Sequence, residues 1–267
     1  TRDFTALFNV HARNLDGTAT LFRANILKQG TNDLVDDFDY GSYPTDGVNR
    51  QHLKTKGGSM RLKWDLDGVT LHAITGYEKL DFYSRADVDG GYGAVYAPPM
   101  GPGYIPFVVE TADVIPEHKQ ISQEFRAESS ARGPLQWIAG LFYFKEDIRI
   151  DSISFNSLAP GNPQNPFYAT QNQSAKSYAA FGSLNYAVSD ALKLRAGLRY
   201  TTDKKDFSAR RVEATTAGPF NLNDTSHNVS WDLSGTYVLT PHTNAYARIA
   251  TGYRAPSMQG RLNGLAD

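Results

Sequence analysis

The stretch Leu192–Tyr200, which reads LKLRAGLRY, decides how the rest of the chain is interpreted. In an extended strand successive side chains point to opposite sides, so the leucines share one face and three bases, Lys193, Arg195 and Arg199, share the other. A sheet with one buried face produces the same alternation. The run of bases, with an aromatic residue ending the apolar face, is more typical of a strand between lipid and a water-filled lumen.

The composition narrows the class of protein. The 267 residues carry a net charge of −1, which argues against nucleic acid as the main partner. The absence of cysteine excludes a disulfide scaffold, a thiolate zinc site and a cysteine nucleophile. No run of about 18 apolar residues predicts a transmembrane helix, whereas a barrel strand needs only about 9–11 residues with every second one apolar.

Alternating segments recur along the chain in pairs. Five pairs predict ten antiparallel strands: 4–12 with 18–27, 59–66 with 69–82, 119–131 with 135–155, 176–188 with 192–207, and 228–239 with 243–254. Within each pair a tight turn is expected, as at Asn14–Gly17 and at Asp67–Gly68. Between the pairs lie long polar segments such as 28–56 and 83–118.

Short and long connections therefore alternate. This sorting is expected of an outer-membrane barrel with short periplasmic turns and long extracellular loops, and it favours that fold over a soluble β-sandwich or propeller. Aromatic residues are expected at both rims of the apolar band. Those near the short turns are Trp64, Tyr186 and Tyr237, and those toward the long loops are Tyr77, Tyr143, Tyr200 and Tyr253.

Several strand motifs resemble one known family. The segments are LHAITGYE at 71–78, QISQEFR at 120–126, WIAGLFYF at 137–144, AGLRYT at 196–201 and ATGYRAPS at 250–257. In this order, each on an expected strand, they resemble TonB-dependent outer-membrane receptors over nearly the whole chain.

The resemblance implies an all-β fold, an antiparallel transmembrane up-and-down β-barrel. Such receptors have about 22 strands around an N-terminal plug, and a short box contacts TonB. Residues 1–267 would be a middle segment of the barrel domain, without the plug and the remaining strands. Consistent with this, no signal peptide precedes Phe4, and we expect both ends to be cuts within a longer protein.

The function implied by the resemblance is TonB-dependent active uptake of a scarce nutrient across the outer membrane, with a ferric siderophore as the leading ligand. Oligosaccharide, cobalamin and haem remain alternatives. The implied partners are the TonB complex, reached through the plug and box, the lipid of the outer membrane and the small ligand. A passive porin and an adhesin or autotransporter-like barrel are rival functions, and a plug upstream would separate uptake from both.

Two groups of residues are candidates for function. Aromatic residues in the loop 83–118 are expected to line a ligand vestibule or to pack among themselves: Tyr92, Tyr96, Tyr104 and Phe107. Charged residues expected to face the lumen would contact the plug or steer an anionic ferric siderophore: Arg61, Lys63, Arg126, Arg195, Arg199, Asp232 and Arg248.

The sequence shows no recognisable set of catalytic residues, so we do not expect the protein to be an enzyme. The six histidines show no metal-ligand spacing, so neither a metal nor a cofactor is expected. Acidic residues crowd two loops, Asp33, Asp36, Asp37 and Asp39 in one and Asp87 and Asp89 in the other. Because neither cluster has the EF-hand spacing, solvated loop charge is favoured over calcium ligation.

Overall fold

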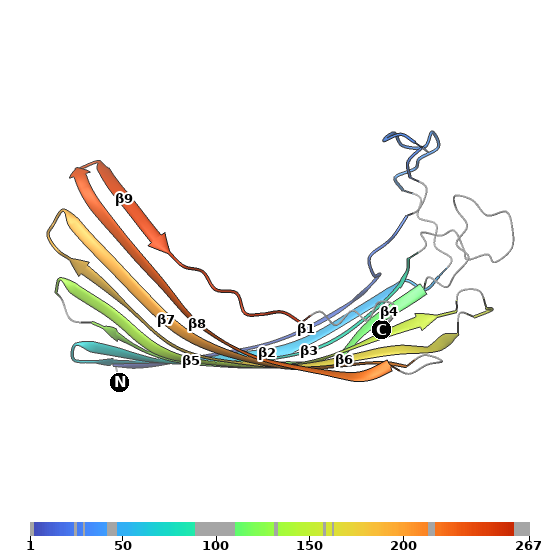
Figure 1. Ribbon diagram of the computed structural model, residues 1–267, viewed down its shortest axis with the longest axis horizontal. Helices are drawn as coiled ribbons and strands as arrows, with labels where there is room; N and C mark the ends of the chain where they lie inside the picture. Colours follow the sequence, from blue (N-terminus) through green and yellow to red (C-terminus); the bar gives the residue numbers. More distant parts are fainter. Residues whose placement is uncertain are drawn as a thin grey trace.

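The computed structural model describes residues 3–23, 26–28, 30–41, 47–88, 110–130, 133–156, 159–161, 163–212 and 217–258. These residues form one antiparallel sheet in which each strand pairs with the next one along the chain (Figure 1). The nine strands are β1 (Phe4–Gly17), β2 (Arg50–Leu66), β3 (Val69–Asp87), β4 (Glu110–Ser129), β5 (Leu135–Phe155), β6 (Gln164–Ala187), β7 (Leu192–Val212), β8 (Ala217–Thr240) and β9 (Thr243–Ala250).

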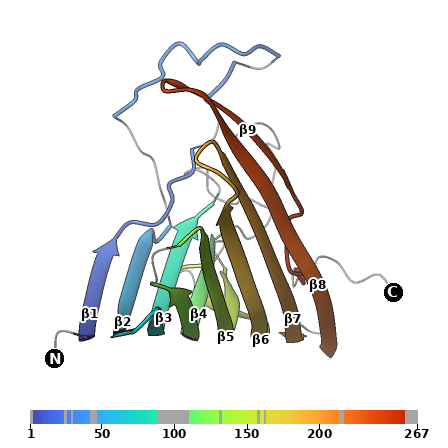
Figure 2. The same cartoon turned by 90° about the vertical axis from the view of Figure 1, so that its left-hand side faces the viewer.

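The up-and-down antiparallel fold expected from the sequence is confirmed. Figure 2 shows the strands following one another from β1 to β8, with β9 continuing the sheet. Among the described residues β1 and β9 are the two edges, so the sheet is an open arc. The same residues include no helix of the length and apolarity needed to cross a membrane.

Four tight connections lie at one end of the sheet. They join β2 to β3, β4 to β5, β6 to β7 and β8 to β9. The first is the two-residue turn Asp67–Gly68, where Gly68 has a φ of 78°, a conformation that glycine adopts without the penalty of a Cβ. This end is called the short-turn end, and the opposite end is called the long-loop end.

The first predicted hairpin is wrong. Asn14–Gly17 does not turn, because β1 continues through Gly17, and the strand pairs with β2 from Phe4↔Trp64 to Gly17↔Gln51. Within 18–28 the described residues contain only an isolated bridge between Leu27 and Leu34. The 14 pairs with β2 match one apolar face to another and outweigh a local turn signal.

The later strands are longer than the sequence predicted. β6 begins at Gln164 and β8 at Ala217, so segments expected to be long loops are paired strand. At about 3.3 Å per residue the 24 residues of β8 span about 80 Å, far more than the roughly 30 Å of a hydrocarbon layer. The added segments of β6 and β8 are rich in polar side chains, as loops are. Hydrogen bonds between neighbouring strands nevertheless hold such segments in the sheet: Ser174 Oγ on β6 donates to Asp147 Oδ1 on β5 at 2.7 Å.

The two faces of the sheet differ in chemistry. Trp231 lies directly opposite Leu198, and Leu233 lies opposite Ala196, so these residues share one side, called the apolar face. Arg195, Arg199 and Asp232 lie on the other side, called the polar face, as expected. Leu198 is 58% exposed, so among the described residues no closed core covers the apolar face.

Candidate functional site

A cluster of charges marks the polar face near the short-turn end. Arg195 Nε lies 3.8 Å and Arg248 Nε lies 3.7 Å from the same Asp232 oxygen, Oδ2. These side chains come from β7, β9 and β8, so the antiparallel register brings them together from three strands. Both arginines are more than half exposed, and two guanidinium groups for one carboxylate leave the cluster positively charged.

Gly197 makes room for this cluster. A Cβ at Gly197 would stand 2.3 Å from Asp232 Oδ1, because the carboxylate lies over the glycine of the neighbouring strand. A larger residue there would displace Asp232 from its position between the arginines. The AGLRYT motif therefore has a packing reason for its glycine.

The remaining predicted polar residues lie on the same face. Lys63 pairs across the strands with His72, and His72 pairs with Arg126, so both bases flank one histidine. Lys63 Nζ lies 2.7 Å from Asp65 Oδ2, and Arg126 Nε donates to Glu124 Oε1 at 2.9 Å.

Arg199 and Arg61 complete the predicted set, and their positions differ. Arg199 lies over the rings of Phe142 and Phe181, with its guanidinium carbon 5.3 and 5.7 Å from the centroids. Arg61 lies opposite Ile74 on the same face as Lys63. The seven predicted side chains thus share one face, but within this set the only ion pairs are those of Arg195 and Arg248 with Asp232.

Histidine–carboxylate pairs are a feature of this face that the sequence did not reveal. His72 lies 2.9 Å from Glu128 and His118 lies 3.1 Å from Glu146, each pair across neighbouring strands. His11 of β1 lies 2.9 Å from Glu78 of β3, across Gly57 of the intervening strand β2. Only the register identifies these partners, since they are 28 to 67 positions apart in the chain. The described residues include no group of three or more metal-ligating side chains placed to hold an ion.

The aromatic loop residues Tyr92, Tyr96, Tyr104 and Phe107 lie outside the described residues. The strand ends that bracket this segment are described. Glu110 is 1% exposed, accepts from Arg85 Nε at 2.5 Å, and also accepts from the backbone N–H of Val48 at 3.0 Å. Arg85 in turn stacks on Phe155, 3.5 Å from its centroid. A buried, fully paired charge therefore fixes the base of the loop to three other segments.

The chain beyond β9 crosses the polar face. The strand predicted to reach Arg254 ends at Ala250 (Figure 1). Beyond this end, Tyr253 donates its hydroxyl to Asp203 Oδ2 at 2.8 Å. The sequence predicted Tyr253 among the aromatic residues at the rim of the apolar band, and that prediction is wrong. The other rim residues, Trp64, Tyr77, Tyr143, Tyr186, Tyr200 and Tyr237, do share the apolar face.

The family model described as "TonB dependent receptor-like, beta-barrel" matches residues 2–265. The chain belongs to the TonB-dependent receptor family. Proteins of this family are receptors of the outer membrane, and the open arc of strands is accordingly a part of a larger barrel.

Solved structures share the fold at low sequence identity. The ferric yersiniabactin uptake receptor FyuA from Yersinia pestis matches with a TM-score of 0.69 at 17% identity, over 92% of this chain and 34% of that one. The ferric-catecholate import receptor Fiu from E. coli K12, in its closed form, matches with 0.68 at 14% identity, over 93% and 41%. The siderophore receptor PiuA from Acinetobacter baumannii matches with 0.63 at 14%, over 93% and 39%. The chain therefore spans between a third and about two fifths of these receptors.

Proposed function

We propose that this chain is part of the wall of an outer-membrane receptor that takes up a scarce nutrient with energy relayed through TonB. The family match over residues 2–265 carries this proposal. A ferric siderophore is the proposed ligand, because the similar structures named above are siderophore receptors. Ligand would bind among the extracellular loops, and TonB would then rearrange a plug inside the barrel.

The polar face is proposed to line the lumen and to contact the plug. The Arg195–Asp232–Arg248 cluster supports this role, because it leaves positive charge exposed that a carboxylate of another domain can pair with. Salt bridges to the plug are favoured over steering of the ligand, since acidic residues such as Glu124, Glu128 and Asp232 alternate with the bases on this face. The aromatic residues Tyr92, Tyr96, Tyr104 and Phe107 are proposed to contact the ligand.

Uptake assays test the proposal. The full-length receptor is expressed in a Gram-negative host that lacks its own siderophore receptors, in strains with and without TonB. Uptake is measured for labelled ferric siderophores, haem, cobalamin and a malto-oligosaccharide. We expect uptake of a ferric siderophore only when TonB is present. Uptake that survives loss of TonB would favour a passive porin, and uptake of a non-iron ligand would correct the substrate class.

A further inference from the structure

Six lysines form a continuous row across the apolar face. Lys56, Lys79 and Lys119 lie directly opposite one another on β2, β3 and β4. Lys145, Lys176 and Lys204 do the same on β5, β6 and β7. Between β4 and β5 the row shifts by two residues along the strand, because Lys145 pairs with Ile121, which is two residues from Lys119. This set is called the lysine row.

The lysine row lies at the long-loop edge of the apolar band. Tyr77, Tyr143 and Tyr178 each stand two residues from a lysine of the row on the same face, which is about 7 Å along the strand. Toward the short-turn end the same face carries Leu141, Leu184 and Leu198, each at least half exposed. Apolar residues, tyrosines and lysines therefore follow one another in this order along neighbouring strands.

Lysines directly opposite one another repel, so a row of them requires counter-charge. Two members find it within the sheet: Lys145 Nζ lies 2.8 Å from Asp147 Oδ2, and Lys119 contacts Glu117. Lys56, Lys79, Lys176 and Lys204 form no ion pair with any part of the chain that the structure describes.

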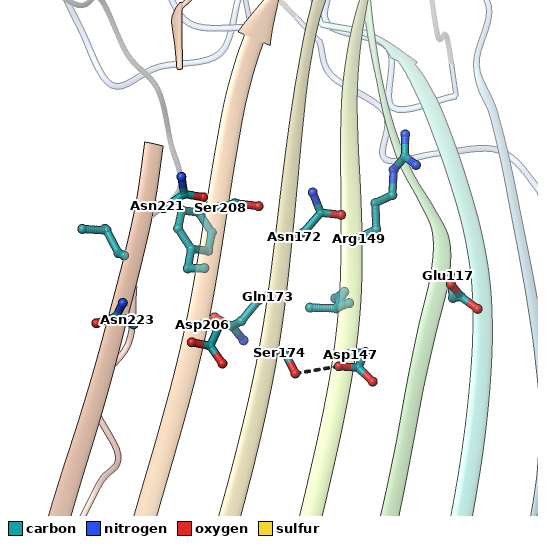
Figure 3. A pocket seen from close by; sticks show the side chains of 13 residues that line it. Glu117, Asp147, Arg149, Asn172, Gln173, Ser174, Asp206, Ser208, Asn221 and Asn223 are labelled. Atoms are coloured by element: carbon teal, nitrogen blue, oxygen red, sulfur yellow. Dashed lines mark hydrogen bonds between the residues drawn. The ribbon is translucent and has the colours of Figure 1, made fainter. Parts of the chain in front are cut away.

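A polar groove lies directly beyond the row. Figure 3 shows its lining side chains, including Asp147, Ser174 and Asp206, each two residues past a lysine of the row. Asn172 and Asn223 add amide groups, and the groove holds about 610 Å³. Amides, carboxylates and hydroxyls at this density are suited to hydrogen-bonding the hydroxyl groups of sugars.

We propose that the lysine row and the groove bind the head group of a phosphorylated glycolipid in the outer leaflet of the membrane. Its acyl chains would lie along the leucines, its phosphates would pair with the unpaired lysines, and its sugars would enter the groove. The order of these layers along the strands matches the order of the parts of such a lipid, and lysines at this depth attract anionic head groups. The proposal rests on the membrane location in the proposed function.

Binding of purified lipopolysaccharide tests this assignment. The full-length receptor in detergent micelles is compared as wild type, as Lys176→Gln with Lys204→Gln, and as a control with Lys193→Gln and Lys205→Gln. The control removes two lysines of the same strand, β7, from the polar face. At about fivefold or somewhat less per lysine near a charged surface, we expect the first variant to bind about 10- to 30-fold more weakly and the control to bind as wild type.

Further arms separate the sources of phosphate. Dephosphorylated lipopolysaccharide should bind wild type and the Lys176/Lys204 variant equally. Phosphatidylglycerol should be affected by the lysine changes but not by Asn172→Ala with Asn223→Ala, which should weaken only the glycolipid. Equal binding of lipopolysaccharide to all variants, or equal loss in the control, would overturn the proposal, and loss with phosphatidylglycerol alone would reject the glycolipid as occupant.

A second measurement does not depend on the variants folding. Lysines of the wild-type receptor are acetylated with and without lipopolysaccharide, and the modified sites are counted by mass spectrometry. Lys176 and Lys204 should be protected by the lipid, while Lys193 should not. Unprotected Lys176 and Lys204 would contradict the proposal. These readouts are independent of TonB, so lipid binding can fail while TonB-dependent uptake stands, and the reverse.

Discussion

The two faces of the sheet satisfy their side chains in opposite ways. On the polar face charges find partners within the chain, as Asp232 does between Arg195 and Arg248 and as His72 does with Glu128. On the apolar face Leu198 and Leu141 remain 58% and 60% exposed. The same strands therefore carry two different chemistries, one on each side, which a strand can do only through its period of two. The proposed wall between a water-filled lumen and lipid requires this difference.

The largest effect is expected from a charge in the middle of the apolar face. Leu198→Arg should destabilise the full-length receptor in lipid vesicles by about 2–4 kcal/mol, because the guanidinium would be placed in hydrocarbon. Ser183→Arg is the matched control, since Ser183 pairs with Gly197, the neighbour of Leu198, and points to the polar face. The free energy of unfolding in urea measures both. Equal costs would mean that the faces do not differ in surroundings.

A smaller effect is expected from close packing on the polar face. A Cβ at Gly140 would stand 2.8 Å from the backbone oxygen of Phe125 and 2.4 Å from the Phe181 ring, so Gly140→Ala should cost about 1–3 kcal/mol. Gly197→Ala should cost less, because the obstacle is the movable carboxylate of Asp232. Unfolding in urea again gives the comparison. A reversed order would show that the carboxylate is held more rigidly than its exposure suggests.

The smallest effect is expected from the exposed charges. Asp232→Asn should change the free energy of unfolding by less than about 1 kcal/mol, because the arginines beside it are more than half exposed and screened by water. The change should shrink further as salt is added. A loss of several kcal/mol would indicate that the cluster is desolvated, as would occur if another domain covered it in the assembled receptor.

The sequence predicted most of the fold because the side-chain period of a strand can be read directly. The alternation in β7 assigned both faces correctly, and Asp67–Gly68 located its hairpin. The prediction of the first hairpin failed because Asn14–Gly17 has the composition of a turn. The strand that this segment pairs with, β2, is about 40 residues away in the chain. The residue types of a short segment do not reveal how strongly that segment pairs with a strand far along the chain.

The candidate site was predicted less completely than the fold. Parity placed Arg195, Asp232 and Arg248 on one face, but only the register of three strands shows that they touch. The lysine row was missed for the same reason, since its members are scattered from Lys56 to Lys204 and become neighbours only when the strands align. Polar strand extensions such as 164–175 also look like loops when the partner strand is unknown.

The most direct test of the two-faced wall is a cysteine scan of residues 192–200 in the native membrane. The chain itself contains no cysteine, so each introduced thiol of this segment reports its own position. Spin labels are attached and their collision rates with oxygen, which partitions into lipid, and with a water-soluble nickel chelate are measured. If the two faces meet lipid and water, positions 194, 196 and 198 favour oxygen and positions 193, 195 and 199 favour the chelate. Equal accessibility at both sets, or one reagent dominating throughout, would contradict the two-faced wall.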